Sequence, residues 1–249
     1  MHPQLIPGLP FQSFGLCVGI GVMLSWMIID RLSKPKDLSG LILLVVFAGV
    51  LGARFAHVIE YWHQDGFDAN PLRAFRFWEG GLVFYGGLIA AVCSFLVWWR
   101  VRREDFFATA DILTVALPLG HAFGRLGCFF NGCCWGRASD AWYAVRFPAT
   151  SFCGPDPVIP TQLFESAALF ALFAALYLVY RRYRRYTTAL YLMAYGVIRF
   201  NIEFLRADDR PDLCGLSSAQ VVSLVALAIG DVFLYLNLKH RGEPACDHR

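Results

Sequence analysis

Residues 124–137 read Gly124-Arg125-Leu126-Gly127-Cys128-Phe129-Phe130-Asn131-Gly132-Cys133-Cys134-Trp135-Gly136-Arg137. The stretch follows an apolar run and is rich in glycine, arginine and cysteine. Glycines let the backbone turn sharply and approach a ligand, because no side chain intervenes. The planar guanidinium of arginine matches the geometry of phosphate. We therefore predict a loop at a membrane surface that binds an anionic headgroup, and the alternative is a solvated turn between two helices.

The amino-acid composition indicates an integral membrane protein. Of the 249 residues, 57% are hydrophobic and 16% are charged, whereas soluble domains are roughly 45–50% apolar and about 25% charged. The bilayer is therefore the expected surrounding. Basic residues form short clusters beside apolar runs and not an aromatic-interleaved face, so we expect no nucleic-acid partner.

Seven apolar runs are long enough to cross a bilayer, because about 20 helical residues span its hydrocarbon core. The predicted fold is an all-α membrane protein with seven transmembrane helices in a single bundle of residues 1–249. The connection at 124–160, between the fourth and fifth helices, is expected to form a small extracytoplasmic head. The expected spans are 11–29, 38–61, 80–99, 106–123, 161–180, 187–205 and 217–238.

Basic clusters follow the first, third, fifth and seventh runs, and therefore fall on one side of the membrane. The positive-inside rule makes this side cytoplasmic. We expect the N-terminus outside and the C-terminus in the cytoplasm. The first run is interpreted as a retained helix, because no basic segment precedes it and no small-residue cleavage site follows it.

Several arginines lie within or beside these runs, where a central arginine costs about 2.5–3.5 kcal/mol to insert. Such residues usually face a polar interior. Arg54, Arg125 and Arg199 come from the second, fourth and sixth runs, and Tyr195, Arg199 and Glu203 share one helical face. We expect the arginines to converge on an anionic lipid headgroup and to stabilise a phosphate leaving group. The alternative is a self-neutralising Arg199–Glu203 pair.

Three further polar residues accompany these arginines. His121 lies four residues before Arg125, so both side chains point to the same side of a helix. Tyr85 lies between glycine pairs at the start of the third run. Its hydroxyl can donate to the same phosphate, or the residue can belong to the belt of tyrosines at the membrane interface. Asp111, nearer the cytoplasmic side, is expected to be a structural hydrogen-bonding residue.

The sequence resembles the prolipoprotein diacylglyceryl transferase family of bacterial inner-membrane enzymes. The resemblance extends over most of the chain in the family's order, and the Gly-Arg-x-Gly block is fairly specific. The expected seven spans with an outer N-terminus agree with that family. The matching segments are Gly52-Ala53-Arg54, Gly80-Gly81, Gly86-Gly87-Leu88, Gly124 to Arg137, Pro160-Thr161-Gln162-Leu163-Phe164-Glu165, and Tyr195-Gly196-Val197-Ile198-Arg199-Phe200 with Glu203.

The resemblance implies an enzyme that moves the diacylglyceryl group of phosphatidylglycerol to the lipobox cysteine thiol of a prolipoprotein signal peptide. It implies the bacterial cytoplasmic (inner) membrane as the location; no cofactor and no metal are expected. By the same resemblance, Arg125 and Arg199 hold the phosphate. Tyr195 and Glu203 orient Arg199, and Glu165 supports the site. The other substrate-binding residues implied by the matching segments are Arg54, Gly86, Gly124, Asn131 and Gly136.

The sequence departs from the family's pattern at Phe14, Tyr85, Cys128 and Cys133, where the family has tyrosine, histidine, asparagine and glutamate. The family's histidine is often assigned as the base. A free thiol has a pKa near 8.5, so the enzyme must lower that pKa or supply a base to form the attacking thiolate. We hypothesise that His121 takes over as the base.

The three cysteines of the block have more than one interpretation. On an oxidising outer face, we predict that Cys128 is bonded to Cys133 or Cys134. A metal site with His121 as the fourth ligand is less favoured, because the spacing matches no known zinc motif. Two other functions stay open: a catalytically altered relative that binds anionic phospholipid, and a membrane thiol–disulfide protein that uses the three cysteines.

Overall fold

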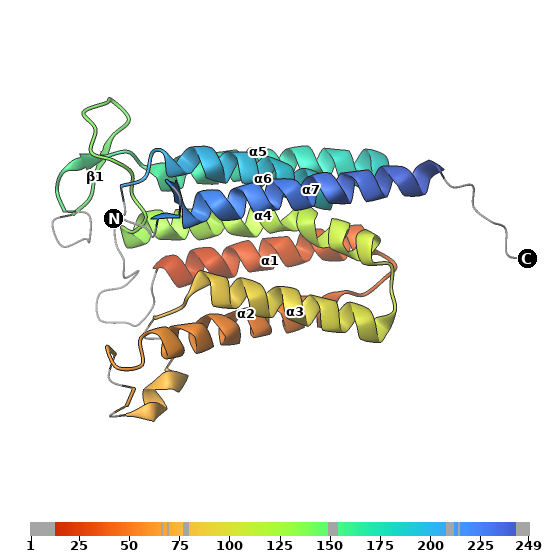
Figure 1. Ribbon diagram of the computed structural model, residues 1–249, viewed down its shortest axis with the longest axis horizontal. Coiled ribbons are helices and arrows are strands. Elements are labelled where there is room, and N and C mark those ends of the chain that lie inside the picture. Colours follow the sequence, from red (N-terminus) through yellow and green to blue (C-terminus); the bar gives the residue numbers. More distant parts are fainter. Residues whose placement is uncertain are drawn as a thin grey trace, which may run out of the picture. The chain divides into compact units, whose positions relative to one another are not determined.

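The computed structural model divides the chain into two compact units, which are described in turn (Figure 1). Unit 1 comprises Met1–Ile29 and Phe107–Arg249, and unit 2 comprises Asp30–Phe106. Residues 11–12 of the first expected span and 149–153 of the expected head lie outside the described residues. The structure describes residues 13–65, 67–68, 70–76, 80–148, 154–207, 212–213 and 215–242.

Within these residues the chain is helical, with seven α helices, one 3-10 helix (η1) and four two-residue strands. The strands, which the sequence analysis did not predict, form two antiparallel pairs, β1 with β2 and β3 with β4. The elements are α1 (Ser13–Ser33), α2 (Ser39–Glu60), η1 (Pro71–Phe75), α3 (Phe84–Arg102), α4 (Phe106–Asn131), β1 (Val145–Arg146), β2 (Pro157–Val158), α5 (Thr161–Tyr183), α6 (Thr187–Glu203), β3 (Asp212–Leu213), β4 (Leu216–Ser217) and α7 (Ser218–Gly242).

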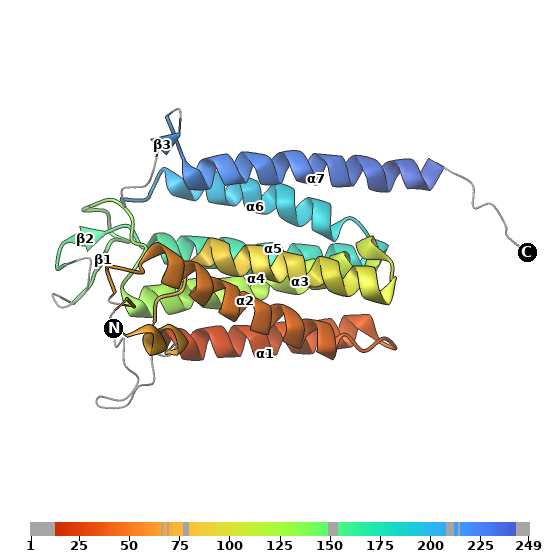
Figure 2. The same ribbon diagram turned by 60° about the horizontal axis from the view of Figure 1, so that its bottom comes forward.

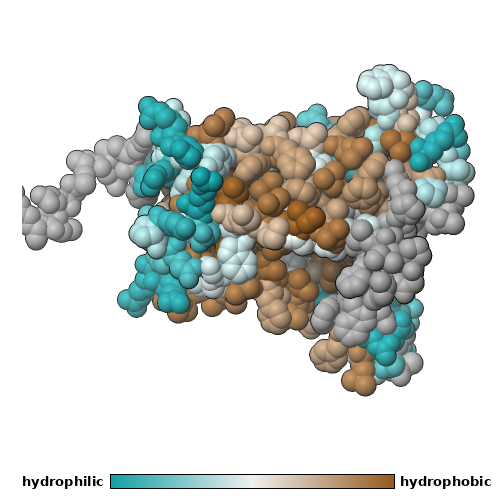
Figure 3. Space-filling view, turned by 180° about the vertical axis from the view of Figure 1, so that it is seen from behind, coloured by the Kyte–Doolittle hydropathy of each residue, from teal (hydrophilic) through white to brown (hydrophobic). Residues whose placement is uncertain are grey.

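Six of the described helices are long and apolar enough to cross a membrane: α1 to α5, and Ser218–Lys239 of α7. The prediction of a helical membrane protein is confirmed at this level. Helix α6 has 17 residues and a length of about 25 Å, against a hydrocarbon core of about 30 Å. On the face shown in Figure 3, hydrophobic residues cover the middle of the helices and hydrophilic residues gather at their ends.

Helix α4 is longer than predicted, because it continues beyond residue 123 to Asn131. The prediction that a loop begins at Gly124 is therefore wrong. Glycine is a poor helix former, but here it permits close helix packing: a Cβ on Gly127 would lie 3.0 Å from the ring of Phe14 in α1. The helix ends where Gly132 adopts a φ of 68°, a common helix C-terminal conformation for glycine.

Asp111 of α4 caps the beginning of α6, which has no side-chain cap from its own N-cap residue Tyr186. The Oδ1 atom of Asp111 accepts the backbone N–H of Thr188 at 2.7 Å and its hydroxyl at 2.6 Å. The hydroxyl of Thr187 donates to the backbone oxygen of Asp111 at 2.9 Å. A carboxylate from α4 thus accepts a backbone N–H in the first turn of α6, where the helix itself supplies no acceptor. This confirms the predicted structural role of Asp111.

In unit 1, the end of α4, the start of α5, the end of α6 and the start of α7 lie at the same end, together with β1 and β2 (Figures 1 and 2). The helices alternate in direction, so the far ends of α5 and α7 lie together at the opposite end. The exposed residues Arg181 and Arg182 lie in the last turn of α5, the exposed Arg184 and Arg185 follow the helix, and Lys239 lies near the end of α7. Arg125, at the end of α4, and Arg199, near the end of α6, therefore lie at the opposite end from these basic clusters, whereas Asp111 lies at the start of α6 beside one of them.

In unit 2, α2 and α3 pack closely through small residues, as the Gly52-Ala53 pair predicts. A Cβ on Gly52 would lie 2.6 Å from the backbone oxygen of Gly86 and would collide with Ala90. A Cβ on Gly86 would likewise lie 2.6 Å from the backbone oxygen of Gly52. Gly86 was expected to bind substrate, and the structure gives it a packing contact between helices.

Replacing Gly52 by alanine is expected to destabilise the protein, because the added methyl group meets backbone that cannot move aside. Overpacking of this kind costs about 1–3 kcal/mol. The matched control is Gly40→Ala in the same helix, where no atom lies within 4 Å of the added Cβ. Thermal unfolding of both variants in one detergent should lower the midpoint only for Gly52→Ala, and equal midpoints would contradict the packing described here.

Candidate active site

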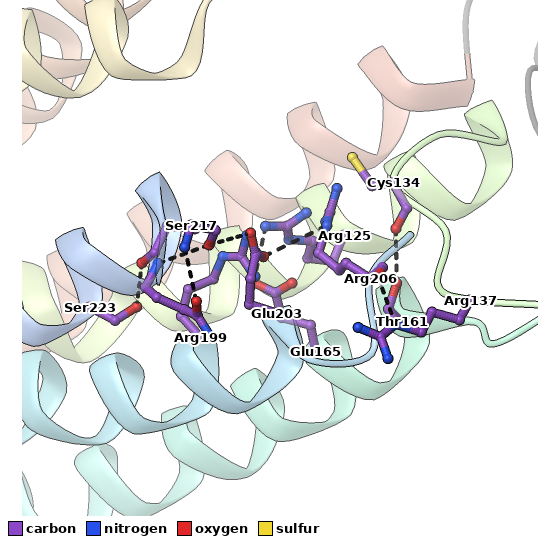
Figure 4. A network of polar contacts seen from close by, with 12 residues as sticks. Arg125, Cys134, Arg137, Thr161, Glu165, Arg199, Glu203, Arg206, Ser217 and Ser223 are labelled. Carbon is purple, nitrogen blue, oxygen red and sulfur yellow. Dashed lines mark hydrogen bonds and ion pairs between the residues drawn. The ribbon is translucent and has the colours of Figure 1, made fainter. Parts of the chain in front are cut away.

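Glu165 of α5 is a buried carboxylate shared by side chains from α4 and α6 (Figure 4). Its side chain is 1% exposed, and its Oε1 atom lies 3.0 Å from Nη2 of Arg125. The hydroxyl of Tyr195 donates to the same oxygen at 3.5 Å, and Nε2 of His121 lies 3.9 Å away. One carboxylate therefore joins three helices and brings together four residues that the sequence analysis selected.

Glu203, the last residue of α6, forms a second buried ion pair. Its Oε2 atom lies 2.7 Å from Nη2 of Arg199 and 3.9 Å from Nε of Arg206. The hydroxyl of Ser217, just before α7, donates to Oε1 at 2.8 Å. The self-neutralising Arg199–Glu203 pair considered for the sequence is thus present. It belongs to a larger network that includes Arg206 and Ser217.

His121 and Tyr195 interact with the arginines of both ion pairs. The rings of these residues are in edge contact, with centroids 5.2 Å apart. The guanidinium groups of Arg125 and Arg199 both interact electrostatically with His121 and with Tyr195. The predicted convergence of Arg125 with Arg199 is therefore found within unit 1.

Several buried polar atoms at this site have no hydrogen-bond partner among the described residues. They are Nε of Arg125, Nη1 of Arg199, Oε2 of Glu165 and Oε1 of Gln162. An unpaired buried polar group costs about 1–3 kcal/mol, and native structures hold few of them. Two spare guanidinium nitrogens, on arginines that both interact electrostatically with His121, are suited to hold an anionic ligand.

The three cysteines of the block also come together. Cys128 lies in the last turn of α4, Cys133 and Cys134 follow the helix, and their Sγ atoms all lie within 4.8 Å of one another. All three are free thiols, so the predicted disulfide is not formed. Instead the thiol of Cys133 donates to the backbone oxygen of Cys128 at 3.7 Å. Hydrogen bonds from the thiols of Cys128 and Cys133, with the nearby charge of Arg206, lower the pKa of the Cys134 thiol below its ordinary value.

The start of α5 fixes the backbone of this cysteine turn. The side-chain amide of Gln162 donates to the backbone oxygen of Cys133 at 2.6 Å. The hydroxyl of Thr161 donates to the backbone oxygen of Cys134 at 2.8 Å (Figure 4). Both donors are buried. The side chain of Asn131 forms a hydrogen bond with the thiol of Cys133.

The two remaining glycines expected at the site differ in their surroundings. A Cβ on Gly124 would meet no atom within 4 Å, so the backbone beside Arg125 is open. Gly136 is buried, and a Cβ there would lie 2.8 Å from Thr161 and 2.9 Å from Ile159. Its N–H donates to the backbone oxygen of Ile159 at 2.9 Å. The absence of a side chain at Gly136 thus lets its backbone pack closely against Ile159 and Thr161, whereas Gly124 leaves room for a ligand.

Arg54 and Tyr85 belong to unit 2, so the site described above contains neither. The buried guanidinium of Arg54 donates four hydrogen bonds of 2.7–3.1 Å to backbone oxygens and lies over the ring of Phe67. The structure therefore gives Arg54 the role of holding the connection between α2 and α3. Tyr85 is 41% exposed and contacts Phe84. The acceptors of the Arg54 hydrogen bonds are Arg73, Ala74, Gly80 and Gly81.

Sequence reasoning missed three residues of the site. Arg206 is 6% exposed and lies three residues after Glu203, a spacing that was available as a signal. Gln162 stands within a quoted matching segment and was given no role. Ser217 carries no local signal, because only the folding of α7 beside α6 brings its hydroxyl to Glu203.

Comparisons with known proteins identify the family to which the chain is similar. The family model described as prolipoprotein diacylglyceryl transferase matches residues 3–236. Three similar proteins are each named phosphatidylglycerol–prolipoprotein diacylglyceryl transferase. The one from Pseudomonas aeruginosa is 34% identical over 227 residues, which cover 84% of this chain and 83% of that protein. The one from Bordetella bronchiseptica is 37% identical over 208 residues (81% and 78%), and the one from Mannheimia succiniciproducens is 32% identical over 244 residues (92% and 89%).

Glu165→Ala is expected to destabilise the protein, because Arg125 would keep its buried charge without its carboxylate. Breaking a buried ion pair costs about 3–5 kcal/mol. Glu165→Gln should cost less, since the amide oxygen can still accept a hydrogen bond. Unfolding in detergent measures both, and Asp140→Ala, at an exposed position, should change the free energy of unfolding by less than about 0.5 kcal/mol. Similar values for all three variants would mean that the shared carboxylate does not stabilise unit 1.

Proposed function

The chain belongs to the prolipoprotein diacylglyceryl transferase family, and on this basis we propose that it transfers the diacylglyceryl group of phosphatidylglycerol to a cysteine thiol of a prolipoprotein. The acceptor is the lipobox cysteine of the signal peptide. The thiolate sulfur attacks a primary carbon of the lipid, and a C–S bond forms while the C–O bond to phosphate breaks. Glycerol phosphate leaves, and the proton of the thiol passes through a base to the product.

The spare donors of Arg125 and Arg199 are the observation that supports this proposal most directly. Each guanidinium is held by one carboxylate, and each keeps a buried nitrogen without a partner among the described residues. A phosphodiester between them supplies the missing acceptors. The same donors then stabilise the charge that develops on the leaving phosphate. The open backbone at Gly124 supports a close approach of the lipid at this point.

His121 is proposed as the base that takes the thiol proton. Its Nε2 atom lies 3.9 Å from the Glu165 carboxylate, and its side chain is 19% exposed. In catalytic triads a buried carboxylate orients the imidazole and stabilises the imidazolium that forms. The contact between the ring of His121 and that of Tyr195 further limits the orientation of the imidazole.

The chain is a multi-pass protein of the bacterial inner membrane, and its finer topology is part of the proposal. We infer seven spans in one bundle, with α6 as the short span. We also infer an extracytoplasmic head that begins after α4, at 132–160 and not at 124, an outer N-terminus and a cytoplasmic C-terminus. The separation of the basic residues after α5 and in α7 from the Arg125 end of unit 1 supports this orientation. Tyr85 is proposed to donate its hydroxyl to the phosphate of the lipid.

Purified full-length protein is expected to transfer labelled diacylglyceryl from phosphatidylglycerol to a lipobox peptide and to release glycerol phosphate in equal amount. A peptide with serine in place of cysteine should accept nothing. Arg199→Gln removes donors for the leaving phosphate and should lower kcat about 100- to 1,000-fold. The matched control is Arg146→Gln, an exposed position in β1. Lipid retention without transfer would reject the proposed function.

His121→Ala should lower kcat about 100-fold or more, the usual contribution of a general base, while binding of phosphatidylglycerol is retained. Binding is measured by retention of the labelled lipid, and turnover by peptide modification at several pH values. His63→Ala, an exposed residue of unit 2, is the control. Unchanged turnover in His121→Ala would assign the base to another group.

A further inference from the structure

The cluster of Cys128, Cys133 and Cys134 has no place in the chemistry proposed so far. The three Sγ atoms lie within 4.8 Å of one another. In tetrahedral zinc sites the Zn–S distance of about 2.3 Å places two sulfurs about 3.8 Å apart. Small side-chain rotations therefore suffice to bring three sulfurs onto one ion. Thiolates are soft ligands that favour zinc over calcium or magnesium.

The backbone that carries these thiols is held by buried polar groups. Gln162 and Thr161, each 1% exposed, donate to the backbone oxygens of Cys133 and Cys134. The N–H of Cys133 donates to the backbone oxygen of Cys128 at 3.1 Å, which closes the turn onto the last turn of α4. A turn fixed from both sides keeps its ligands ordered before the ion arrives.

Positive charge surrounds the cluster. Arg125 interacts electrostatically with Cys128 and Cys134, and the buried guanidinium of Arg206 interacts with Cys134. Three thiolates around one Zn²⁺ carry a net negative charge, and these guanidinium groups offset it. The same contacts place the cluster next to the arginine that is proposed to hold the phosphate.

The described residues supply three ligands to this cluster and no fourth. His121, considered as a fourth ligand from the sequence, lies seven residues before Cys128, about 10 Å along α4, and contacts Glu165 instead. Structural zinc sites are closed by four protein ligands, whereas catalytic sites have three and keep one position for water or substrate. The ligand count favours an open site.

We propose that Cys128, Cys133 and Cys134 bind one zinc ion, and that the acceptor cysteine of the prolipoprotein takes its fourth coordination position as a thiolate. The second half of this proposal rests on the proposed function. A zinc-coordinated thiol loses its proton, and His121, the base of the proposed function, receives it. The bound sulfur then forms the C–S bond, the C–O bond to phosphate breaks, and glycerol phosphate takes up the proton. The zinc ion is neither oxidised nor reduced.

Metal content of the purified full-length protein tests the first half. Protein loaded with Zn²⁺ and then desalted should hold about one zinc ion per chain, and X-ray absorption should show sulfur ligands. Cys128→Ser and Cys133→Ser should each reduce bound zinc at least 10-fold. Cys93→Ser, which removes an exposed thiol of α3, should retain it. If the cluster variants do not fold, the wild-type measurement still decides: a chain that binds no zinc, or whose cluster is a disulfide, overturns the proposal.

Cobalt substitution tests the second half without using turnover. Co²⁺ in the same site gives absorption bands that report the number of thiolate ligands. A lipobox peptide with cysteine should change these bands, and the same peptide with serine should not. Identical spectra with both peptides would overturn the role of the fourth position.

The transfer assay separates this proposal from the proposed function. Transfer by a chain that binds no zinc overturns only the zinc site, and a zinc-binding chain that responds to the cysteine peptide but transfers no lipid overturns only the function. Removal of zinc by a chelator should lower transfer at least 10-fold, and added Zn²⁺ should restore it. Undiminished transfer after complete removal would contradict the proposal.

Discussion

A carboxylate buried between membrane helices must be neutralised, and Glu165 imposes this constraint on the end of unit 1 that carries the site. Transfer of an isolated charge out of water costs several kcal/mol, which only close opposite charge and hydrogen bonds can offset. Arg125 supplies the charge from α4, and Tyr195 supplies a hydrogen bond from α6. The alignment of three helices at this end therefore depends on one side chain of α5.

Glu203 applies the same constraint to the last turn of α6. It is paired with Arg199, and the hydroxyl of Ser217 completes its hydrogen bonding from the segment before α7. Each carboxylate occupies only part of the donor capacity of its arginine. One nitrogen of each, Nε of Arg125 and Nη1 of Arg199, stays buried and without a hydrogen-bond partner among the described residues. This combination of fixed position and spare donor capacity is what distinguishes a binding site from a structural ion pair.

The buried arginine of unit 2, Arg54, differs from Arg125 and Arg199 because backbone oxygens satisfy its guanidinium. Arg54 directs its guanidinium to four backbone oxygens of the connection between α2 and α3. Gly81, with a φ of 74°, brings its backbone close to that guanidinium, and a Cβ there would lie 2.8 Å from Nη1. Arg54 and Arg199 are buried to a similar extent, with 8% and 7% of their surface exposed. They differ because loop carbonyls satisfy one of them, whereas a carboxylate satisfies the other only in part.

The sequence by itself determined the helical membrane class, six helices long and apolar enough to cross a membrane, the small-residue contact at Gly52, and the shared face of Tyr195, Arg199 and Glu203. These features follow from hydrophobic length and helical periodicity, which are local properties of the chain. Only the tertiary structure decided that α4 runs on to Asn131, that Glu165 is shared by three helices, and that three thiols gather where a disulfide was expected. Such features depend on contacts between segments far apart in the sequence, and the free energy of these contacts outweighs the local preferences of glycine and cysteine.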